Sequence, residues 1–447
     1  MTTVEKGKQG ASVSPLDRAW ELRLTDRPAE ALAWATAALQ ARPEDDEAAW
    51  LLAELVAEQR TPRPEPVGQV LRTLARRWGA RGELPRAVAA VHALAPEDTE
   101  ARRELLRWLG QRFGRDSEAL REGVLLPPPA LPAEVTPPEE RDDLDGLVER
   151  ALGALEGWLM AAEPPDESAP VPPLPLFSAL PAEPLRDLLD SLEVRRLASE
   201  QAVLREGERG EEAFVLVRGS ARVTRGTPAE GPLLARLGPG AVFGEMALVS
   251  EAPRAATVVA EEPVVLLVLR RDVLERLAGR HPEVGEELGR FAHGRMVANL
   301  VRHSPVLSAL PAAERPRLME RFEARRFEPG QRLVVQGEEP EGLYLLASGA
   351  VEVVTRDEDG ERLRLAGLGP GEVVGEISLV LRRPATADVV AVAPTVALRL
   401  AREAFREAIA AHPRLLNELY ELATKREEET RSVLAQEALD AEEVVLL

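Results

Sequence analysis

The C-terminal half of the chain carries short apolar runs of strand length, separated by glycine-rich turns. Residues 214–217 and 264–269 are such runs, residues 221–223 alternate apolar and polar, and a helical pattern begins at Asp272. Runs of this length bounded by turn residues indicate strands. Many short strands with glycine punctuation are typical of a small β-barrel or jelly roll. The pattern therefore predicts barrel domains with helices at both ends.

This half of the chain is an internal duplication. The segment FGEMALVSEAPRAATVVA, residues 243–260, aligns without a gap with VGEISLVLRRPATADVVA, residues 374–391. The flanking segments match as well, at an offset of 130 residues early in the repeat and 131 later. One residue is therefore inserted in a loop, near Gly226 or Asp359.

The N-terminal part of the chain has helix signals instead. Ser14 and Pro15 form a helix start, as N-cap and first helical residue. The segment PEDDEAAWLLAELVAE from Pro43 returns as PEDTEARRELLRWL from Pro96, 53 residues later, and an alanine-rich helix precedes each copy. Such pairs resemble tetratricopeptide repeats, although that repeat has a period of about 34 residues. A plain helical bundle with an aromatic core explains the pattern equally well, and both interpretations stay open.

A proline-rich stretch follows this helical part. Residues 124–175 hold twelve of the 37 prolines, which prevents continuous helix and favours an extended linker. One amphipathic helix interrupts the stretch, and we expect its apolar face to pack on a neighbouring domain; a helix for partner docking or dimerisation is the alternative. The face consists of Leu144, Leu147, Val148, Leu152, Leu155, Trp158 and Leu159.

Together these signals predict a multidomain α+β chain, with an α-helical module followed by two jelly-roll barrels that have flanking helices. Helix-rich and strand-rich segments that follow one another along a chain are typical of this class. The predicted boundaries are 1–123 for the helical module, 124–174 for the linker, 175–303 and 304–425 for the two barrels, and 426–447 for an acidic helical tail.

Composition narrows the possible functions. A net charge of −20 argues against a nucleic-acid-binding surface and opposes adsorption to anionic membranes. The absence of cysteine excludes disulfides, thiol catalysis and thiolate metal sites. No signal peptide or membrane span is recognisable, and the five histidines lack metal-ligand or catalytic spacing. We therefore expect a cytoplasmic protein that is not an enzyme and needs no cofactor or metal. The abundance of Arg, Ala, Pro and Leu suggests a high-GC bacterial gene.

The segment FGEMALVSEAPRAATVVA closely resembles the phosphate-binding cassette of cyclic nucleotide-binding domains. These domains occur in the regulatory subunits of cAMP-dependent protein kinase and in the bacterial catabolite activator. The likeness rests on Phe-Gly-Glu, a small residue two positions beyond the glutamate, and Pro-Arg-Ala-Ala at fixed spacing, and it extends from Pro175 to about Lys425. It implies a cyclic nucleotide site formed by Phe243, Gly244, Glu245, Met246, Ala247, Arg254, Ala255 and Ala256.

Each residue type fits a group of the nucleotide. The planar guanidinium of Arg254 suits two phosphate oxygens at once, which a lysine does not match. Gly244 and Ala247 lack bulk, and free backbone N–H groups at a helix start favour an anion. The resemblance implies that Glu245 accepts a hydrogen bond from the ribose 2′-hydroxyl. Family members that prefer cGMP often place threonine where Ala255 stands, so the resemblance favours cAMP.

The second repeat departs from this pattern. Gly375 and Glu376 persist, but Ala385 stands in the place of the arginine. A hydrogen bond to a charged group contributes roughly 1.5–3 kcal/mol, so its loss weakens phosphate binding. Asp388 adds a negative charge that we expect near the phosphate position, and the arginines at residues 382–383 lie in a preceding loop. We therefore predict a degenerate second site.

The sequence thus predicts a non-enzymatic regulator that senses cAMP, or another cyclic nucleotide, in its first barrel. Helices after that barrel, residues 282–303, would relay binding to the second barrel, and the helical module would hold an unidentified protein partner. The alternative is a nucleotide-independent interaction scaffold built on degenerate barrels. A transcription factor of the catabolite-activator type is less favoured, because the acidic tail is too short for a winged helix.

Overall fold

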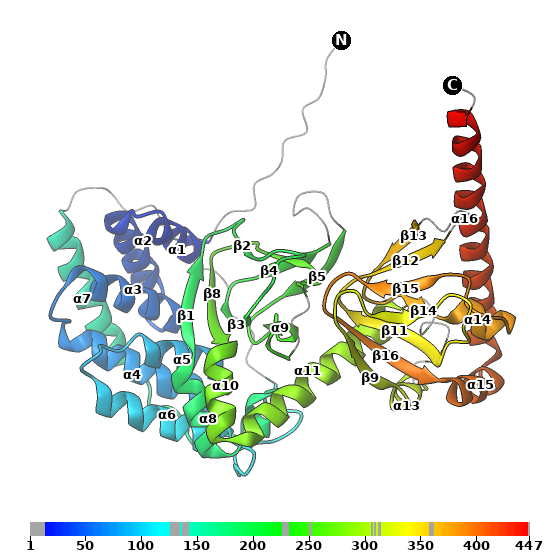
Figure 1. The fold of residues 1–447 in the computed structure, drawn as a ribbon. Helices are drawn as coiled ribbons and strands as arrows, with labels where there is room; N and C mark the ends of the chain where they lie inside the picture. Colours follow the sequence, from blue (N-terminus) through cyan, green and yellow to red (C-terminus); the bar gives the residue numbers. More distant parts are fainter. Residues whose placement is uncertain are drawn as a thin grey trace. The chain divides into compact units, whose positions relative to one another are not determined.

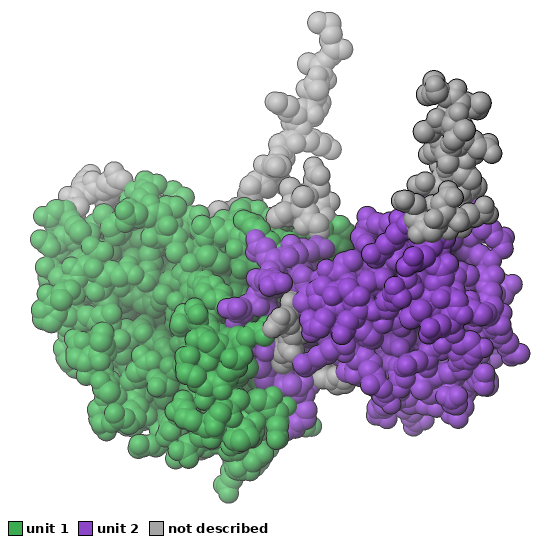
Figure 2. Space-filling model, viewed as in Figure 1, with its two compact units in different colours: residues 1–205, 212–243, 257–287 green, residues 206–211, 244–256, 288–447 purple. Residues whose placement is uncertain are grey.

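The computed structural model describes most of the chain. It covers residues 14–125, 135, 143–225, 232–249, 253–304, 307, 310–311, 314–356 and 362–445. The chain divides into two compact units (Figure 2), of which unit 1 comprises residues 1–205, 212–243 and 257–287 and unit 2 comprises residues 206–211, 244–256 and 288–447. The single-residue insertion expected near Gly226 or Asp359 falls outside the described residues.

Unit 1 begins with six helices that form the helical module (Figure 1). Each helix packs against the next one along the chain, and the rings of Trp20, Trp50 and Trp78 meet edge to face with centroids 5.5 Å apart. Such packing suits a bundle and a repeat alike, so the tetratricopeptide assignment stays a prediction. The helices are α1 (Pro15–Leu24), α2 (Pro28–Ala41), α3 (Asp46–Gln59), α4 (Glu65–Ala80), α5 (Leu84–His92) and α6 (Thr99–Phe113).

The amphipathic helix of the linker is α7 (Leu144–Ala161). It packs against α2, α3 and α4 of the same unit, as expected of a helix that covers a neighbouring domain. Its apolar stripe is largely inside the unit. The buried residues are Leu147, Val148, Ala151, Leu155 and Trp158.

Each repeat folds into two four-stranded antiparallel sheets with the same strand order. The first barrel pairs β1-β8-β3-β6 and β2-β7-β4-β5, and the second pairs β9-β16-β11-β14 and β10-β15-β12-β13. The strands of the first are β1 (Glu193–Leu197), β2 (Ala202–Leu204), β3 (Glu212–Arg218), β4 (Ala221–Thr224), β5 (Leu233–Leu237), β6 (Val242–Phe243), β7 (Thr257–Ala260) and β8 (Val264–Arg270). Those of the second are β9 (Glu323–Phe327), β10 (Arg332–Val334), β11 (Gly342–Ser348), β12 (Val351–Arg356), β13 (Arg362–Leu368), β14 (Val373–Val374), β15 (Asp388–Ala391) and β16 (Thr395–Ala401).

The two sheets of each barrel enclose an apolar core. In the first barrel, Phe214 and Leu216 of β3 meet Val258 of β7 and Val264 of β8 inside this core. Phe214 and Leu216 are two positions apart, and alternate side chains of a strand face the same side of the sheet. The predicted helical module and two jelly-roll barrels are thereby confirmed.

Helices flank each barrel, as the sequence predicts. They are η1 (Phe177–Ala179), α8 (Ala182–Ser191), α9 (Met246–Val249), α10 (Arg271–Arg280) and α11 (Pro282–His303) for the first repeat, and α13 (Arg315–Met319), α14 (Glu376–Leu381), α15 (Arg402–Ala411) and α16 (Pro413–Val445) for the second. The long helix α16 runs without a break through the predicted boundary at residue 425. Within the described part of the chain, none of the helices combines the length and the apolar character needed to cross a membrane.

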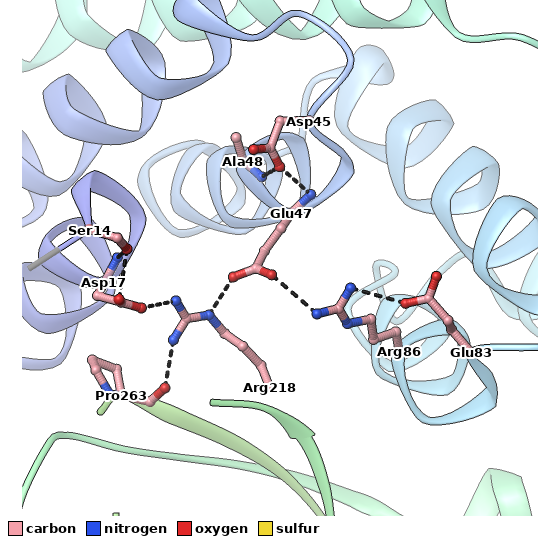
Figure 3. Close-up of polar contacts among 9 residues, drawn as sticks. All are labelled: Ser14, Asp17, Asp45, Glu47, Ala48, Glu83, Arg86, Arg218 and Pro263. Carbon is pink, nitrogen blue, oxygen red and sulfur yellow. Dashed lines mark hydrogen bonds and ion pairs between the residues drawn. The ribbon is translucent and has the colours of Figure 1, made fainter. Parts of the chain in front are cut away.

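Buried ion pairs fix the helical module to the first barrel (Figure 3). Arg218, at the end of β3, is 5% exposed; its guanidinium pairs with Asp17 of α1 and lies 2.6 Å from Glu47 of α3. It also donates to the carbonyl of Pro263 at 2.6 Å. Glu47 in turn meets Arg86 of α5 at 3.2 Å. One strand-end arginine thus ties two helices of the module to the sheet.

A second cluster repeats this arrangement along β1. Arg196 reaches Glu54 of α3 at 2.6 Å, and Arg23 of α1 holds the other oxygen of the same carboxylate at 2.5 Å. Glu54 is only 4% exposed, so both pairs are shielded from solvent. Ser199 donates its hydroxyl to Glu21 at 3.1 Å nearby. The module and the barrel therefore share polar contacts at β1 as well as at β3.

This interface predicts a pH dependence of the stability of unit 1. Burial alone would raise the pKa of Glu47, but Arg218 and Arg86 outweigh it and hold the pKa below its usual 4.5. A depressed folded-state pKa stabilises the fold fully above the unfolded value and loses that contribution as pH falls through the folded value. We expect the melting-temperature difference between wild type and Glu47→Gln to shrink as the pH falls below about 4.5.

Tryptophan fluorescence measures this transition, because all six tryptophans lie between residues 20 and 158. Glu100→Gln is the control, since the Glu100 side chain is 89% exposed. A Glu47→Gln melting curve that keeps a constant distance from wild type between pH 7 and pH 3.5 would contradict the prediction.

Candidate functional site

The cassette of the first repeat begins with a tight backbone turn. Gly244 has a φ of +75°, a conformation that favours glycine. Its carbonyl accepts a hydrogen bond from the N–H of Ala247 at 3.2 Å, and the carbonyl of Glu245 accepts one from Leu248 at 3.0 Å. These bonds close the short helix α9. The N–H of Ala247, which the sequence suggested as free for an anion, is therefore engaged within the cassette.

Arg254 is held in place by its backbone and by a glycine. Its N–H donates to the carbonyl of Glu208 and its own carbonyl accepts from Gly207, each at 2.9 Å. Its Nη1 donates to the carbonyl of Gly244 at 2.8 Å. A Cβ placed on Gly210 would lie 2.2 Å from the Arg254 guanidinium, which is far below any real contact. The guanidinium thus lies against the backbone of Gly210, and a larger residue there would require the guanidinium to move.

Glu245 completes the cluster from the other side of the turn. Its side chain is 6% exposed, and its carboxyl lies 3.6 Å from Nε of Arg295 on α11. Burial raises the pKa of Glu245, and the guanidiniums of Arg295 and Arg254 oppose this rise only in part. A hydroxyl both donates and accepts, so it can pair with this carboxyl in either protonation state. The structure thus brings Gly244, Glu245 and Arg254 together.

The other predicted site residues lie elsewhere around the cassette. Phe243 belongs to β6 and stacks on Phe214 with centroids 5.3 Å apart, inside the core of the first barrel. Met246 is partly buried against the apolar cluster of unit 2. Ala255 is exposed and Ala256 half-buried. Phe243 and Met246 therefore support the cassette through packing.

The second repeat keeps the same backbone frame. Gly375 has a φ of +86°, like its counterpart in the first repeat. The N–H of Ala385 donates to Glu338 and its carbonyl accepts from Gly337, each at 2.8 Å. These two bonds correspond to the pair that flanks Arg254. The backbone of residue 385 is therefore held in the same way as that of Arg254. At this position the two repeats differ in the side chain.

A second substitution accompanies the lost arginine. The alignment pairs Gly210 with Pro340, whose Cβ stands where the Arg254 guanidinium of the first repeat approaches its glycine. A Cβ on Gly375 would lie 3.7 Å from that of Pro340, so the proline lies beside the cassette turn. Ala385 is buried in the barrel core. The second repeat has therefore lost both the arginine and the surface on which it rests.

A cavity of about 270 Å³ remains at this place in unit 2, lined by Glu376 and Ala385 of the cassette and by Lys425 and Arg426 of α16. Arg426 donates to Glu376 at 2.7 Å and to the carbonyl of Val373. Burial raises the pKa of Glu376, and Arg426 lowers it only in part. The positive charge in this cavity thus comes from Lys425 and Arg426 of α16.

The charges expected near the second phosphate position have other partners. Asp388 accepts from the backbone N–H of Gln336 at 2.8 Å and lies 3.4 Å from Arg332. It does not line the cavity, so the expectation that its charge faces a phosphate there is not met. Arg383 lies 2.9 Å from Glu427. As expected, it does not replace the missing arginine in this cavity.

Sequence reasoning missed three residues of the two sites. Arg295 and Arg426 align at the offset of 131, and each follows its cassette glutamate by fifty residues. Extending the repeat alignment beyond the barrels would have revealed this pair. Gly210 carried a weaker signal, the replacement by proline in the copy that lacks Arg254. Neither pattern could show by itself which groups touch.

Two segments, residues 194–281 and 324–412, match the family described as "Cyclic nucleotide-binding domain". A curated relative, the "cAMP-dependent protein kinase regulatory subunit" of Yarrowia lipolytica, is 30% identical over 233 residues, which cover 52% of this chain and 58% of the relative. The type II regulatory subunit of Drosophila melanogaster is 29% identical over 223 residues, covering 50% and 56%. The chain thus spans little more than half the length of either relative.

A solved structure also aligns with the chain. The regulatory domain of Toxoplasma gondii PKA, crystallised with cAMP, is 22% identical over 56% of this chain and 92% of its own, with a TM-score of 0.28. A TM-score this low supports no functional argument. The two curated relatives are eukaryotic regulatory subunits. They give no support to the bacterial origin suggested by composition or to the tetratricopeptide assignment.

Proposed function

We propose that this chain, in which two segments match the cyclic nucleotide-binding domain, is a regulator that binds cAMP, or a related cyclic nucleotide, at the cassette of its first domain. Such domains are regulatory and not catalytic, and the relatives are regulatory subunits. The observation that carries the proposal is the Arg254 guanidinium, fixed on the backbone of Gly210. A preorganised guanidinium loses little entropy when it binds a phosphate bidentately.

The proposed contacts follow from the geometry of the cassette. The phosphate would pair with Arg254, which already donates to the neutral carbonyl of Gly244. The ribose hydroxyl would pair with the buried carboxyl of Glu245. Ala255 has no side-chain hydroxyl at the position after Arg254. Because family members that prefer cGMP often place threonine there, the alanine favours cAMP.

A relay from the cassette would pass through α11. The Glu245 carboxyl lies 3.6 Å from Arg295 of this helix, so a ligand that takes over the carboxyl changes the electrostatic environment of the helix. Coupling requires that the nucleotide binds two arrangements with different affinity. The helical module, fixed to the first barrel by Arg218 and Arg196, would hold a protein partner. The names of the relatives make a kinase catalytic subunit the first partner to test.

For the second domain we propose that it has lost nucleotide binding and serves as a scaffold. Three observations support this proposal: Ala385 replaces the arginine, Pro340 replaces the glycine beside it, and Arg426 holds the Glu376 carboxylate. Arg295 makes a longer contact of the same kind in the first repeat. Because both repeats have an arginine near the cassette glutamate, Ala385 and Pro340 are the differences that account for the proposed loss of nucleotide binding.

Calorimetric titration of the whole chain with cAMP tests the proposal. We expect a single site in wild type and affinity about 10- to 150-fold weaker in Arg254→Ala, since a hydrogen bond to a charged group contributes roughly 1.5–3 kcal/mol. Arg254→Lys should recover only part of the loss, because an ammonium does not pair with two phosphate oxygens in a planar fork.

Arg276→Ala is the matched control, because it removes an equal charge from a side chain that is 64% exposed in the same domain. Titrations with cGMP and with a cyclic dinucleotide define the preferred ligand. Absence of heat in wild type at high micromolar concentrations of all three ligands would reject the proposal, and two equal sites would reject the asymmetry between the domains.

A further inference from the structure

Unit 2 contains a second hollow, separate from the cavity of its cassette. Its volume is about 420 Å³, and four arginines line it: Arg382, Arg383, Arg402 and Arg406. Two follow α14 and two lie one turn apart on α15. The lining residues of the two cavities have only Ser378 in common. The hollow is therefore a distinct site.

The positive charge of this hollow is only partly neutralised. Arg402 pairs with Glu339, and Arg383 lies 2.9 Å from Glu427. Among the residues that the structure describes, neither Arg382 nor Arg406 has an ion-pair partner, and Nε of Arg383 is buried without a hydrogen-bond partner. Buried polar atoms are nearly always paired in native proteins, so an unpaired guanidinium nitrogen indicates a missing acceptor.

The first repeat shows that the barrel does not need these charges. At the positions of Arg382, Arg383 and Arg406 it carries Glu251, Ala252 and Glu275. Only Arg402 has an arginine as its counterpart in the first repeat. The copy that lost the cassette arginine therefore has three additional arginines at one place, in a chain whose net charge is −20. Structural need of the shared fold does not explain this cluster.

The floor of the hollow is apolar. Leu379 of α14 and Phe405 and Ile409 of α15 line it between the arginines. Phe405 is buried, and it belongs to the apolar core of unit 2. A volume of about 420 Å³ lies in the range of small-molecule pockets, roughly 300–1,000 Å³. The combination suits a compact anion that carries an apolar group.

We propose that this hollow binds a small phosphate-bearing molecule with an apolar portion. Guanidinium groups pair with phosphate oxygens in a bidentate manner, and several of them around one hollow favour a dianionic phosphate or a diphosphate over a single carboxylate. The apolar portion would contact Phe405 and Ile409. Because the hollow joins α14 to α15, an occupant links the cassette helix of the second domain to the helix behind its barrel.

Two phosphate probes test the site on the whole chain. By calorimetry at constant ionic strength we expect one site for inorganic pyrophosphate, and tighter binding of phenyl phosphate than of inorganic phosphate because of the apolar floor. The swap variant Arg382→Glu, Arg383→Ala, Arg406→Glu carries the residues of the first repeat, which that barrel tolerates. We expect it to weaken pyrophosphate binding at least about tenfold, as losing charge-assisted hydrogen bonds predicts.

Three controls separate this site from its alternatives. Arg364→Ala removes an arginine that is 65% exposed on β13 outside the hollow, and it should leave pyrophosphate binding unchanged. The swap variant should bind cAMP like wild type, so failure of this proposal and failure of the proposed cAMP site give different results. Equal pyrophosphate affinity of wild type and the swap variant, or binding of a glutamate-rich peptide without binding of either phosphate probe, would overturn the proposal.

Discussion

Replacing Arg218 with alanine is expected to lower the free energy of unfolding of unit 1 by roughly 3–5 kcal/mol, because it removes a buried cation from two partly buried carboxylates. Asp17 and Glu47 approach this guanidinium from two different helices, and Arg218 is only 5% exposed. Removing the cation strands the charge of Asp17, while Glu47 keeps Arg86 at 3.2 Å. The loss of the hydrogen bond to Pro263 adds to the effect.

Urea unfolding followed by tryptophan fluorescence measures this loss within the helical module and the linker helix, where all the tryptophans lie. Arg218→Lys keeps the charge, but a single ammonium does not reach three acceptors in a planar fork, so an intermediate loss is expected. Arg276→Ala removes an exposed, paired arginine and should change stability by less than about 1 kcal/mol.

A change of less than about 1 kcal/mol in Arg218→Ala would show that the module is not fixed to the barrel through this arginine. The triple replacement Arg218→Met, Asp17→Leu, Glu47→Leu separates the cost of unpaired charge from the cost of losing the geometry of the ion-pair network. Apolar residues of similar size often replace a buried ion network without a loss of stability. Recovery in the triple variant would assign the cost to stranded charge, whereas a persistent loss would assign it to the geometry of the network.

The duplication made most of the fold predictable. Two aligned copies reveal which positions are apolar in both, and those positions form the strands and turns of the barrels. The match of Gly207 to Gly337 and of Gly219 to Gly349 marks turns in which all four glycines have positive φ. The helical module was predictable from caps, since the side chain of Ser14 accepts from the N–H of Asp17.

The polar contacts between distant segments were not predictable. Arg218 and Asp17 are 201 residues apart, and neither lies in a motif. Their pairing depends on which face of β3 the module covers, which is a property of the assembled unit. The runs in β3 and β8 were apolar on both faces, which indicates burial on both sides without naming the covering element.

In the candidate site, too, contacts within one segment were predictable from the sequence and contacts between distant segments were not. The spacing of the cassette identified Glu245 and Arg254, because their chemistry is local to one segment. Gly210 lies 44 residues before Arg254 and acts only through the absence of a side chain. Its role became visible when the loop and the guanidinium were placed against each other.

This relation between Gly210 and Arg254 predicts how nucleotide binding can be restored in the second domain. Ala385→Arg alone is expected to fail, since Pro340 occupies the surface on which the guanidinium of the first repeat rests. Ala385→Arg combined with Pro340→Gly should create a cAMP site. The gain is expected to be roughly 10- to 150-fold, because each hydrogen bond to a charged group contributes roughly 1.5–3 kcal/mol.

The backbone of the second repeat already holds residue 385 as the first repeat holds Arg254. Residue 385 has both of the backbone hydrogen bonds that position Arg254, at 2.8 Å, and Glu376 remains in the cavity of about 270 Å³. Pro340→Gly keeps the carbonyl that accepts from Arg402 at 2.8 Å. The glycine frees the unfolded chain and costs about 0.4–1 kcal/mol of stability, which unit 2 must tolerate.

The measurement uses an Arg254→Ala background, so that heat from the first site does not mask the second. Four chains are titrated with cAMP: the background alone, the background with each single change, and the background with both changes. Pro340→Gly alone should remain without a site, because it supplies no cation. Equal affinity of the Ala385→Arg single variant and the double variant would remove Pro340 from the explanation. Failure of the double variant, with a melting temperature near that of the background, would mean that the arginine and its glycine are not the features that separate the two domains.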